Sequence, residues 1–304
     1  MEDKKELFIS AIILTRDEQH NLPACLESIK NYVDEIIIVD SFSTDSTIEI
    51  ASKYTNKIYQ HKFINQAQQF KWALNNIDIA NEWILRVDAD ERWTTEGFAE
   101  LREIIDHDLA DGVSVKMKMY FMHRWIKHGD FYPNFFLRVF KRSKGTIEDR
   151  LMDEHINVTG RTIMSNIDVI ENNYDRQNNI TGWITKHNNY ATREAIEFLS
   201  IKYQLRSIET IANLVGGKTE RKRWLKENLY YKLPLFARAF LFFLYRYFIK
   251  LGFLDGREGF IYLLLQGFWY RFLVDTKIYQ LEKIAHNERR DIRDVIMEHY
   301  GMEL

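Results

Sequence analysis

The sequence predicts an α/β fold: a mixed, mostly parallel sheet flanked by helices, followed by a helical, amphipathic C-terminal region. Three observations predict it. Short apolar runs alternate with segments of helical periodicity through the first 110 residues. The connections between them are short and polar, as in parallel strands joined by covering helices. Beyond about residue 221 the chain becomes basic, aromatic and rich in leucine.

The elements of the first part are assigned from apolar periodicity. The first run is apolar and of strand length, and the second is rich in isoleucine. After the first run, Leu22, Leu26 and Ile29 recur on one face of a helix. We expect strands at residues 7–14, 35–39, 57–59 and 82–87, and helices at residues 22–32, 44–54 and 65–75.

The next hundred residues are organised differently. Residues 113–120 alternate and predict a strand, and residues 137–141 predict another. Between them, residues 123–133 form an aromatic, basic loop. Residues 182–200 have helical spacing, and the glycines of residues 216–219 predict a linker.

The C-terminal region departs most from an ordinary soluble protein. Aromatic residues reach 14% of the chain and gather between residues 230 and 279. The apolar runs 234–250 and 259–274 are interrupted by polar side chains, so neither reaches the roughly 18–20 residues of a spanning helix. Arginines among aromatics and leucines favour helices lying in a membrane interface. Two helices packed as protein core are the alternative.

Bulk composition excludes some classes of protein. The chain has 304 residues and a net charge of −2, so charge gives no indication of a nucleic-acid partner. Cys25 is the only cysteine, which excludes an intrachain disulfide and fits a reducing compartment. Residues 1–6 are charged and lack the apolar region of a signal peptide, so we expect a cytoplasmic protein.

Polar side chains gather just after three of the expected strands. These clusters are residues 15–18, 40–43 and 88–91. In open α/β sheets, ligands bind outside the carboxyl ends of the strands. We therefore expect the three clusters to converge on one crevice.

Asp88-Ala89-Asp90 contains two carboxylates separated by one residue. On an extended segment, alternate residues point the same way, and two carboxylates can hold one hard ion, Mg²⁺ or Mn²⁺. Such an ion can bridge a diphosphate and neutralise its charge. The same spacing is frequent by chance in loops, but its place after an apolar strand favours a metal site.

Four further side chains have two interpretations each. Asp40 could accept a hydrogen bond from a nucleoside, or it could cap a turn or helix. The same alternatives hold for Thr15 and Glu18. Lys71 could reach a phosphate, or it could be a solvated surface lysine.

Asp153-Glu154-His155 is a second charged constellation. Transfer of a group to a hydroxyl requires a base that takes the proton, and a carboxylate suffices. His155 could be base, ligand or support. A solvated charged loop is the alternative.

Taken in order, these segments resemble glycosyltransferase family 2, the inverting enzymes of GT-A fold. Residues 9–18 resemble the family's first strand and the Thr-Lys/Arg-Asn-Glu that follows, with Asp17 in place of the asparagine. Residues 35–47 resemble its second signature, with Phe42 where glycine is frequent. Residues 83–91 are close to its metal-binding segment.

The resemblance continues into the second half of the chain. Residues 132–140, 152–155 and 251–259 look like bacterial lipopolysaccharide-core and capsule glycosyltransferases of this family. In those enzymes a glutamate follows an apolar residue and a histidine. Here Asp153 takes the place of the histidine, so the base is either Glu154 or Asp153.

The resemblance implies roles for these residues. The donor would be a nucleotide-sugar of the UDP class, and Asp90, with Asp88, would hold Mn²⁺ or Mg²⁺ on its diphosphate. Glu154 or Asp153 would deprotonate the acceptor hydroxyl, and the product would have an inverted anomeric centre. The residues implied in nucleotide-sugar binding are Thr15, Arg16, Glu18, Asp40, Ser41, Lys71, Asp88 and Ala89.

The resemblance also divides the chain. It implies a GT-A catalytic domain at residues 1–215, with a nucleotide-sugar half at about 1–110 and an acceptor half at about 111–215. Residues 216–304 would form a helical region that binds the membrane surface. The acceptor would be a cell-envelope glycan or a lipid-linked molecule, and the protein would lie on the inner face of the cell membrane.

Two other functions remain open at this point. A nucleotidyltransferase would share the α/β start and the acidic metal site, but it usually carries a glycine-rich, basic loop after the first strand. The loop here is Thr15-Arg16-Asp17-Glu18. A non-catalytic, membrane-associated scaffold of the same fold is the second alternative, and the presence of Asp88, Asp90 and Glu154 argues against it.

Overall fold

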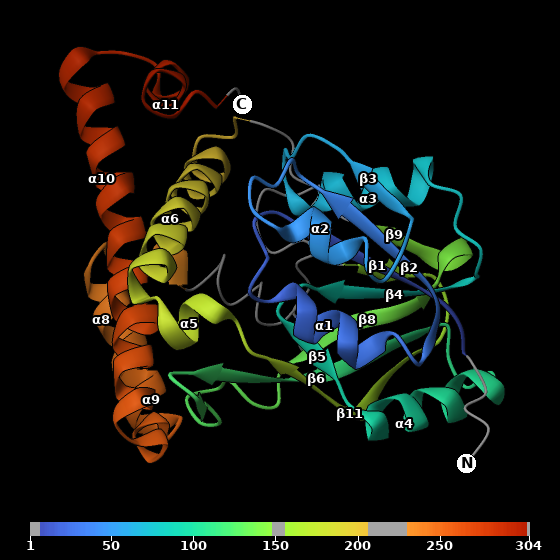
Figure 1. Ribbon diagram of the computed structural model, residues 1–304. Coiled ribbons are helices and arrows are strands. Elements are labelled where there is room, and N and C mark those ends of the chain that lie inside the picture. Colours follow the sequence, from blue (N-terminus) through green and yellow to red (C-terminus); the bar gives the residue numbers. More distant parts are fainter. Residues whose placement is uncertain (1–6, 148–155, 206–229, 303–304) are drawn as a thin grey trace. The chain divides into compact units, whose positions relative to one another are not determined.

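The computed structural model describes residues 7–147, 156–205 and 230–302 (Figure 1). Contacts divide the chain into two compact units, residues 1–180 and residues 181–304. The domain boundary expected from the sequence, between residues 215 and 216, falls outside the described residues, as does the expected linker at 216–219. The expected domain boundary therefore stays a prediction.

The first unit is built on one large sheet with the strand order β3-β2-β1-β4-β8-β6-β11-β5, and β7 pairs with β6. Strands β1, β2, β3, β4, β6 and β11 run in one direction, whereas β8, β5 and β7 run against their neighbours. The predicted mixed, mostly parallel sheet is confirmed. The strands are β1 (Leu7–Thr15), β2 (Val33–Asp40), β3 (Ile58–Gln60), β4 (Trp83–Asp88), β5 (Glu91–Trp93), β6 (Gly112–Phe121), β7 (Arg124–Trp125), β8 (Phe135–Lys141) and β11 (Thr162–Glu171), with a separate pair β9 (Gly145–Ile147) and β10 (Ile156–Val158).

Helices cover both faces of this sheet (Figure 1). One face packs against α1 (Leu22–Ile29) and α4 (Thr95–Asp106) in a core that includes Ile13 and Phe98. The other face packs against α3 (Gln66–Asn76), where Phe70 meets side chains such as Ile12. Successive residues of β1 thus enter opposite cores, as the alternation of a strand requires. The remaining helices of this unit are α2 (Thr47–Ala51) and α5 (Tyr174–Asn178).

Local sequence explains where these helices begin. The Asn65 side chain accepts a hydrogen bond from the Gln68 backbone N–H at 2.8 Å and caps α3. Thr94 caps α4 in the same way through Gly97, at 3.0 Å. The expected helix at residues 44–54 is shorter in the structure, because the chain through Asp45 is a turn whose carboxylate accepts the backbone N–H of Thr47 at 2.9 Å.

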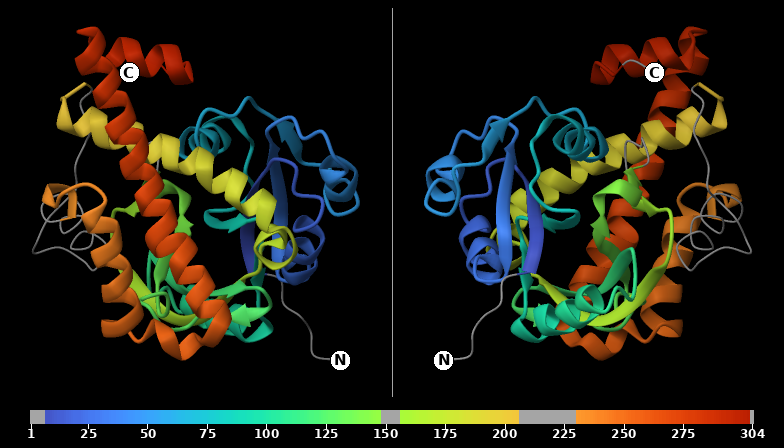
Figure 2. Two further views of the ribbon diagram at one scale, coloured as in Figure 1. Left: turned by 90° about the vertical axis from the view of Figure 1, so that its left-hand side faces the viewer. Right: turned by 90° about the vertical axis from the view of Figure 1, so that its right-hand side faces the viewer.

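The second unit is helical. Its core joins α6 (Ile180–Lys202), α10 (Tyr270–Glu288) and α11 (Ile292–Tyr300), and Figure 2 shows α11 turning away at the end of the long helix α10. Helix α8 (Ala237–Leu244) continues as a π-helical segment, residues 245–249. A 3₁₀ turn (Gly252–Asp255) leads into α9 (Gly256–Tyr262), and a second π-helical segment, residues 263–269, leads into α10. Over the described parts of the chain, no helix combines the length and apolarity needed to cross a bilayer.

A buried ion pair lies in this helical unit. Arg238 and Asp275 are both 1% exposed, and Arg238 Nε lies 2.8 Å from a carboxylate oxygen of Asp275. The other Asp275 oxygen accepts the backbone N–H of Phe236 at 2.7 Å. The Arg238 guanidinium also lies over the rings of Phe198 and Tyr230. These contacts offset the cost of burying two charges and join α8 to α10.

Candidate active site

The register of the sheet places the ends of three strands together. Thr15, the last residue of β1, pairs with Asp40 at the end of β2. On the other side of β1, Leu14 pairs with Asp88 at the end of β4. Because the three strands are parallel, their carboxyl ends share one edge of the sheet, where ligands bind in open α/β folds.

Asp40 is fully buried at this edge, and its carboxylate is well supplied with donors. The Thr15 hydroxyl donates to Oδ1 at 3.0 Å, and the Ser43 hydroxyl donates to the same oxygen. The backbone N–H of Ser43 donates to Oδ2 at 2.8 Å, and Gln60 Nε2 lies 3.4 Å from that oxygen. Asp40 therefore makes the contacts of a turn cap, which is one of the two interpretations of this residue. The adjacent Ser41 hydroxyl accepts from Gln69 at 3.1 Å.

The two loops that follow β1 and β2 hold each other in place. Asp17, at a φ of 53°, accepts the backbone N–H of Thr44 at 2.7 Å, and its own N–H donates to Ser43 at 2.8 Å. The backbone N–H of Glu18 donates to the Thr47 hydroxyl at 2.8 Å. Arg16 is exposed on this loop. The Asp17 that departs from the family pattern is thus the residue that joins the loops.

Asp88 and Glu91 share one buried arginine, Arg138 of β8. Arg138 Nη2 lies 2.6 Å from Asp88 Oδ2 and also contacts Glu91 Oε1. Arg86 Nε lies 3.8 Å from the other Asp88 oxygen. Burial raises the pKa of Asp88, but the charges of Arg138 and Arg86 outweigh it and hold that pKa below its usual value. Asp88 is therefore ionised at neutral pH.

Asp90 points to a different part of the chain. Asp88 ends β4, and Ala89 and Asp90 form a turn, so the extended geometry assumed from the spacing is wrong. The Asp90 carboxylate accepts from Asn173 Nδ2 at 3.0 Å and lies 3.7 Å from Arg176 Nη2. Asn173 lies just after β11. The turn thus directs its two carboxylates to different partners.

The pKa of Cys25, buried beneath this turn, reports the local charge. Burial raises the pKa of the thiol well above its usual value, and the negative charges of Glu91, Asp90 and Asp88 raise it further. The thiol also lies 3.7 Å from the backbone oxygen of Asp88. The thiol therefore lies close to the carboxylates of the turn and stays protonated.

Asp88 and Asp90 carry oxygen ligands of the kind a hard divalent ion takes, although one oxygen of each carboxylate already contacts protein donors. Both offer the hard carboxylate oxygens that Mg²⁺ and Mn²⁺ prefer. Within residues 7–147, 156–205 and 230–302, no group of three or more His, Cys, Asp or Glu side chains is placed to hold a metal. Mg²⁺ is commonly held by one or two carboxylates and completed by substrate phosphates. A divalent ion held by Asp88 or Asp90 would therefore have to complete its coordination with oxygens that these two side chains do not supply.

Four of the remaining predicted residues are not placed at the Asp88–Asp90 turn by the described contacts, whereas Ala89 is part of the turn. Lys71 is exposed on α3, one residue beyond the buried Phe70. Asp153 and Glu154, the two candidate bases, lie outside the described residues, and so does His155. Ala89 is buried in the turn beside Asp88.

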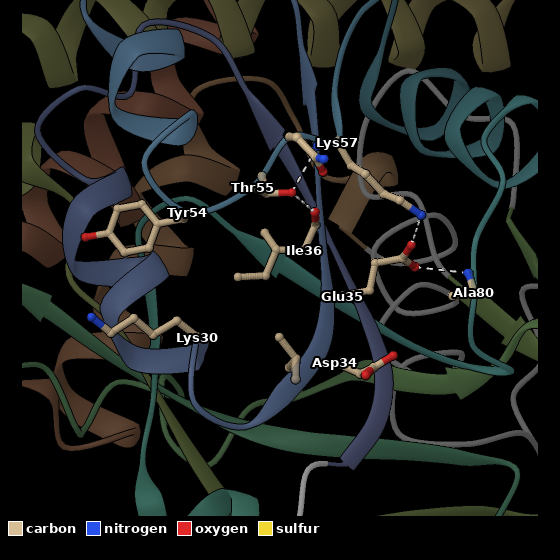
Figure 3. Close-up of a pocket in the computed structure, with 10 residues that line it drawn as sticks. Lys30, Asp34, Glu35, Ile36, Tyr54, Thr55, Lys57 and Ala80 are labelled. Atoms are coloured by element: carbon tan, nitrogen blue, oxygen red, sulfur yellow. Dashed lines mark hydrogen bonds and ion pairs between the residues drawn. The ribbon is translucent and has the colours of Figure 1, made fainter.

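A pocket of about 480 Å³ lies elsewhere, at the amino end of β2 (Figure 3). Its polar groups bond one another: the Glu35 carboxylate contacts Lys57 and accepts the backbone N–H of Ala80 at 3.1 Å. The buried Ser10 hydroxyl also donates to Glu35. These contacts tie the amino ends of β1 and β2 together, far along the strands from Thr15 and Asp40. The polar residues of this pocket are therefore accounted for by contacts within the protein.

The model of the family described as "Glycosyl transferase family 2" matches residues 10–166, which is more than half of the chain and includes the whole edge described above. The chain belongs to glycosyl transferase family 2. The resemblance read from the sequence is confirmed, and the sheet with its flanking helices is a GT-A fold.

Two curated proteins similar to this chain are described as uncharacterized glycosyltransferases. One from Rickettsia felis is 35% identical over 117 residues, which are 38% of this chain and 41% of that protein. The match to this relative thus spans about two fifths of its length. An uncharacterized glycosyltransferase of Rickettsia prowazekii is 29% identical over 285 residues, covering 92% of this chain and 89% of that one.

Two solved structures are also similar to this chain. TarS of S. aureus (residues 1–349) aligns with a TM-score of 0.43 and 14% identity, over 93% of this chain and 92% of that chain. Glucosyl-3-phosphoglycerate synthase from Mycobacterium tuberculosis, in complex with Mn²⁺, uridine diphosphate and glucosyl-3-phosphoglycerate, aligns with a TM-score of 0.32 and 17% identity. That alignment covers 36% of this chain and 44% of that chain.

The sequence did not reveal which residues hold the acidic turn, by which we mean Asp88, Ala89, Asp90 and Glu91. Arg138 was noticed only as part of a resembling segment, and no role was assigned to Arg86, Asn173 or Arg176. Each of the last three partners Asp88 or Asp90 from a position that spacing alone does not connect to them. The one available signal was an arginine inside each of two apolar strands, since a charge buried in a strand requires a partner.

Proposed function

We propose that this glycosyltransferase moves a sugar from a UDP-sugar to a hydroxyl of a cell-envelope glycan or lipid-linked acceptor, with inversion at the anomeric carbon. The family supports glycosyl transfer. The observation that carries the donor site is the register that brings Thr15, Asp40 and Asp88 to one edge of the sheet. A nucleotidyltransferase has no comparable support, because the loop after β1 lacks the glycines that such an enzyme uses.

The nucleoside would bind at the ends of β1 and β2. An ionised carboxylate has about four acceptor positions, and those of Asp40 are already shared among Thr15, Ser43 and Gln60. Gln60 makes the longest of these contacts, at 3.4 Å, so a base N–H or ribose hydroxyl would replace it at least cost. Ser41 and Glu18 would line the same end.

The diphosphate would bind beside the acidic turn. Asp90 would hold Mn²⁺ or Mg²⁺, and Asp88 would lie near the ribose and diphosphate. An ion bound there neutralises charge on the leaving nucleoside diphosphate. Arg138 keeps Asp88 ionised and oriented. The exposed cations Arg16 and Lys71 would contact phosphate oxygens from the surrounding loop and helix.

The proton of the acceptor hydroxyl would pass to a carboxylate. Glu154 is our first choice for this base and Asp153 the second, on the strength of the family resemblance. The hydroxyl oxygen would attack the anomeric carbon as the bond to the diphosphate breaks. Attack from the face opposite the leaving group gives the inverted product.

The helical unit supports a membrane surface as a further partner. Exposed apolar side chains crowd the region between α8 and α9, where Phe248 is 55% exposed and Ile249 is 70% exposed. Arg246 and Lys250 lie over aromatic rings in the same region. Helices that lie in the headgroup layer combine Lys and Arg with Phe and Leu on their two faces, and the long side chains of Lys and Arg can cover apolar surface while keeping their charge in water. The enzyme would therefore be peripheral on the inner face of the cell membrane.

The chain is folded to hold this apolar surface outward. Leu251 adopts a left-handed conformation with a φ of 57°, and its side chain is 46% exposed. Gly252 is required next to it, because a Cβ there would lie 2.2 Å from a Leu263 side-chain atom and 2.9 Å from a backbone oxygen. The turn therefore presents Phe253 and Leu254, 43% and 49% exposed, at a fixed place.

A screen of nucleotide-sugars tests the proposed donor. Thermal unfolding is measured with UDP-, GDP- and ADP-sugars in the presence of Mn²⁺, together with slow hydrolysis of each donor. We expect UDP-sugars to raise the unfolding temperature and to be hydrolysed, and we expect Asp90→Asn to lose both effects without a change of fold. Stabilisation by GDP-sugars alone, or by none of the three classes, would contradict the proposal.

A further inference from the structure

Two lysines converge on one carboxylate on the face that β6 and β11 share. Lys118 Nζ lies 2.8 Å from Asp168 Oδ2, and Lys116 Nζ lies 3.6 Å from Oδ1. The Tyr132 hydroxyl donates to Asp168 Oδ1 at 2.8 Å. Burial alone would raise the pKa of Asp168, but the hydrogen bonds and charges around it bring that pKa below its usual value. Asp168 is therefore one negative charge facing two positive ones.

Two aromatic rings form the surroundings of these lysines. Lys118 Nζ lies 5.1 Å from the centre of the Trp125 ring, and Lys127 lies over the same ring at 5.5 Å. Lys116 lies 5.9 Å from the centre of the Tyr132 ring. Trp125 and Tyr132 also meet edge to face, with centroids 5.1 Å apart. The lysines therefore lie against two aromatic rings that contact each other.

The indole N–H of Trp125 adds a second observation. This nitrogen is buried and has no hydrogen-bond acceptor among the described residues. Buried polar atoms in folded proteins are nearly always paired, and an unpaired one is costly. An indole N–H can only donate, so the partner it lacks is an oxygen such as a hydroxyl, carboxylate or phosphate oxygen.

The charges of Lys116, Lys118 and Asp168 also favour a partner that carries oxygen and negative charge. The side chains of Lys116 and Lys118 are only 16% and 27% exposed, so solvent screens them poorly. One carboxylate cannot neutralise both ammonium groups. The Lys118–Asp168–Tyr132 contacts make a satisfied structural network, but among the described residues they leave the charge of Lys116 only partly balanced and the Trp125 donor without an acceptor.

The cluster lies at the same edge of the sheet as the donor site. Strands β6 and β11 run parallel to β1 and β4, so their carboxyl ends point to the edge where Asp40 and Asp88 lie. Asp168 is five residues before Asn173, which bonds the Asp90 carboxylate. Five extended residues span at most about 17 Å. A saccharide of a few units bridges that distance.

We propose that Lys116, Lys118 and Trp125 bind a negatively charged group, a phosphate or a carboxylate, carried by the acceptor saccharide. The inference rests on the glycosyl transfer proposed above and names the chemical class of its acceptor. The two ammonium groups would pair with the anion, and the indole N–H would donate to one of its oxygens or to a neighbouring hydroxyl. The anion would fix the acceptor on the sheet face.

Binding of simple charged sugars to the full-length protein tests this assignment. The probes are glucose 6-phosphate, glucuronate, uncharged glucose and inorganic phosphate, each titrated by ligand-observed NMR. The variants are Lys116→Gln/Lys118→Gln and Asp168→Asn, with the exposed Lys53→Gln as a matched control. UDP with Mg²⁺ is titrated into the same samples, and circular dichroism checks that each variant is folded.

Loss of two charge-assisted contacts should weaken binding of the charged sugars by about tenfold or more. Uncharged glucose, UDP and the Lys53→Gln control should be unaffected. Asp168→Asn should tighten binding of the charged sugars by about threefold, because it removes the competing carboxylate while keeping a hydrogen-bond acceptor for Tyr132. Because Asp168→Asn changes the affinity for charged sugars in the opposite direction, it tests the assignment even if the double variant fails to fold.

Several results would overturn the assignment. One is equal binding of glucose and glucose 6-phosphate by the wild-type protein, and another is unchanged binding in the lysine double variant. Phosphate that binds as tightly as glucose 6-phosphate, with no binding of glucuronate, would indicate an anion site with no role for the sugar. A wild-type protein that binds the charged sugars but not UDP would instead contradict the donor proposal while supporting the lysine site.

Discussion

Replacing Arg138 by methionine tests the account of how the acidic turn is held. Arg138 is 7% exposed and contacts both Asp88 and Glu91, and Glu91 is 1% exposed. Removing one partner of a buried ion pair leaves an uncompensated charge and costs about 3–5 kcal/mol. For a unit of this size, such a loss lowers the unfolding temperature by on the order of 10 °C. Thermal unfolding followed by circular dichroism measures it.

The pH dependence of the Arg138→Met variant is the sharper observation. Burial raises the pKa of Glu91 well above its ordinary 4.5, and Arg138 opposes that rise. Without Arg138 the pKa of Glu91 in the folded protein rises further. A carboxyl whose pKa is raised on folding contributes its full stability below the unfolded pKa and loses it as pH rises through the folded pKa. The stability that the variant lacks relative to wild type should therefore increase as pH rises through the range in which Glu91 ionises in the folded protein.

A second substitution tests whether Glu91 causes the pH dependence of stability in the Arg138→Met variant. In Arg138→Met/Glu91→Gln the buried Glu91 carboxyl is gone and only Asp88 lacks its counter-charge, so we expect part of the lost stability to return and the pH dependence due to Glu91 to disappear. An unfolding temperature within about 2 °C of wild type for Arg138→Met would refute the reasoning, since it corresponds to less than about 1 kcal/mol. A deficit that does not change with pH would also contradict the role of Glu91.

Three further predictions concern other parts of the chain. Glu154→Gln should lose turnover but still bind UDP, as judged by donor hydrolysis and calorimetry; if only Asp153→Asn behaves so, the base is Asp153. Asp275→Asn should lower the free energy of unfolding by about 3–5 kcal/mol in urea, because Arg238 is left buried without its counter-charge, and a loss under about 1 kcal/mol would show that the pair is dispensable. Phe253→Ser/Leu254→Ser should reduce binding to liposomes on the order of thirtyfold in a flotation assay, because two half-exposed apolar side chains no longer enter the bilayer; unchanged flotation would favour helices packed against protein.

The parts of the fold that the sequence predicted are those with strong local signals. The isoleucine and valine runs of β1, β2 and β4 are buried on both faces, so they read as continuous apolar strands. Helix α3 was expected at residues 65–75, and in the structure Asn65 caps its first turn. These elements position Thr15, Asp40 and Asp88, so the edge of the sheet at which we propose the donor binds followed from the sequence.

Other elements were missed because their signals are weaker or lie far apart. Helix α4 carries a Thr94 cap and buries Phe98, Leu101 and Ile104 at helical spacing, a signal that was present but not used. Strand β11 is rich in polar residues, and it is fixed by pairing with β6 and β5, which are distant in sequence. The partners of Asp88 and Asp90 come from such distant strands, so spacing alone could not reveal them.

The central claim is that the acidic turn holds a divalent ion on the diphosphate of a nucleotide-sugar. Calorimetric titration of UDP into the full-length protein, with Mn²⁺ and then with a chelator, tests it most directly. We predict that UDP binds the wild-type protein with Mn²⁺, that the chelator abolishes binding, and that Asp90→Asn does not bind under either condition while keeping its unfolding temperature. UDP binding by Asp90→Asn at wild-type affinity in Mn²⁺ would contradict the claim.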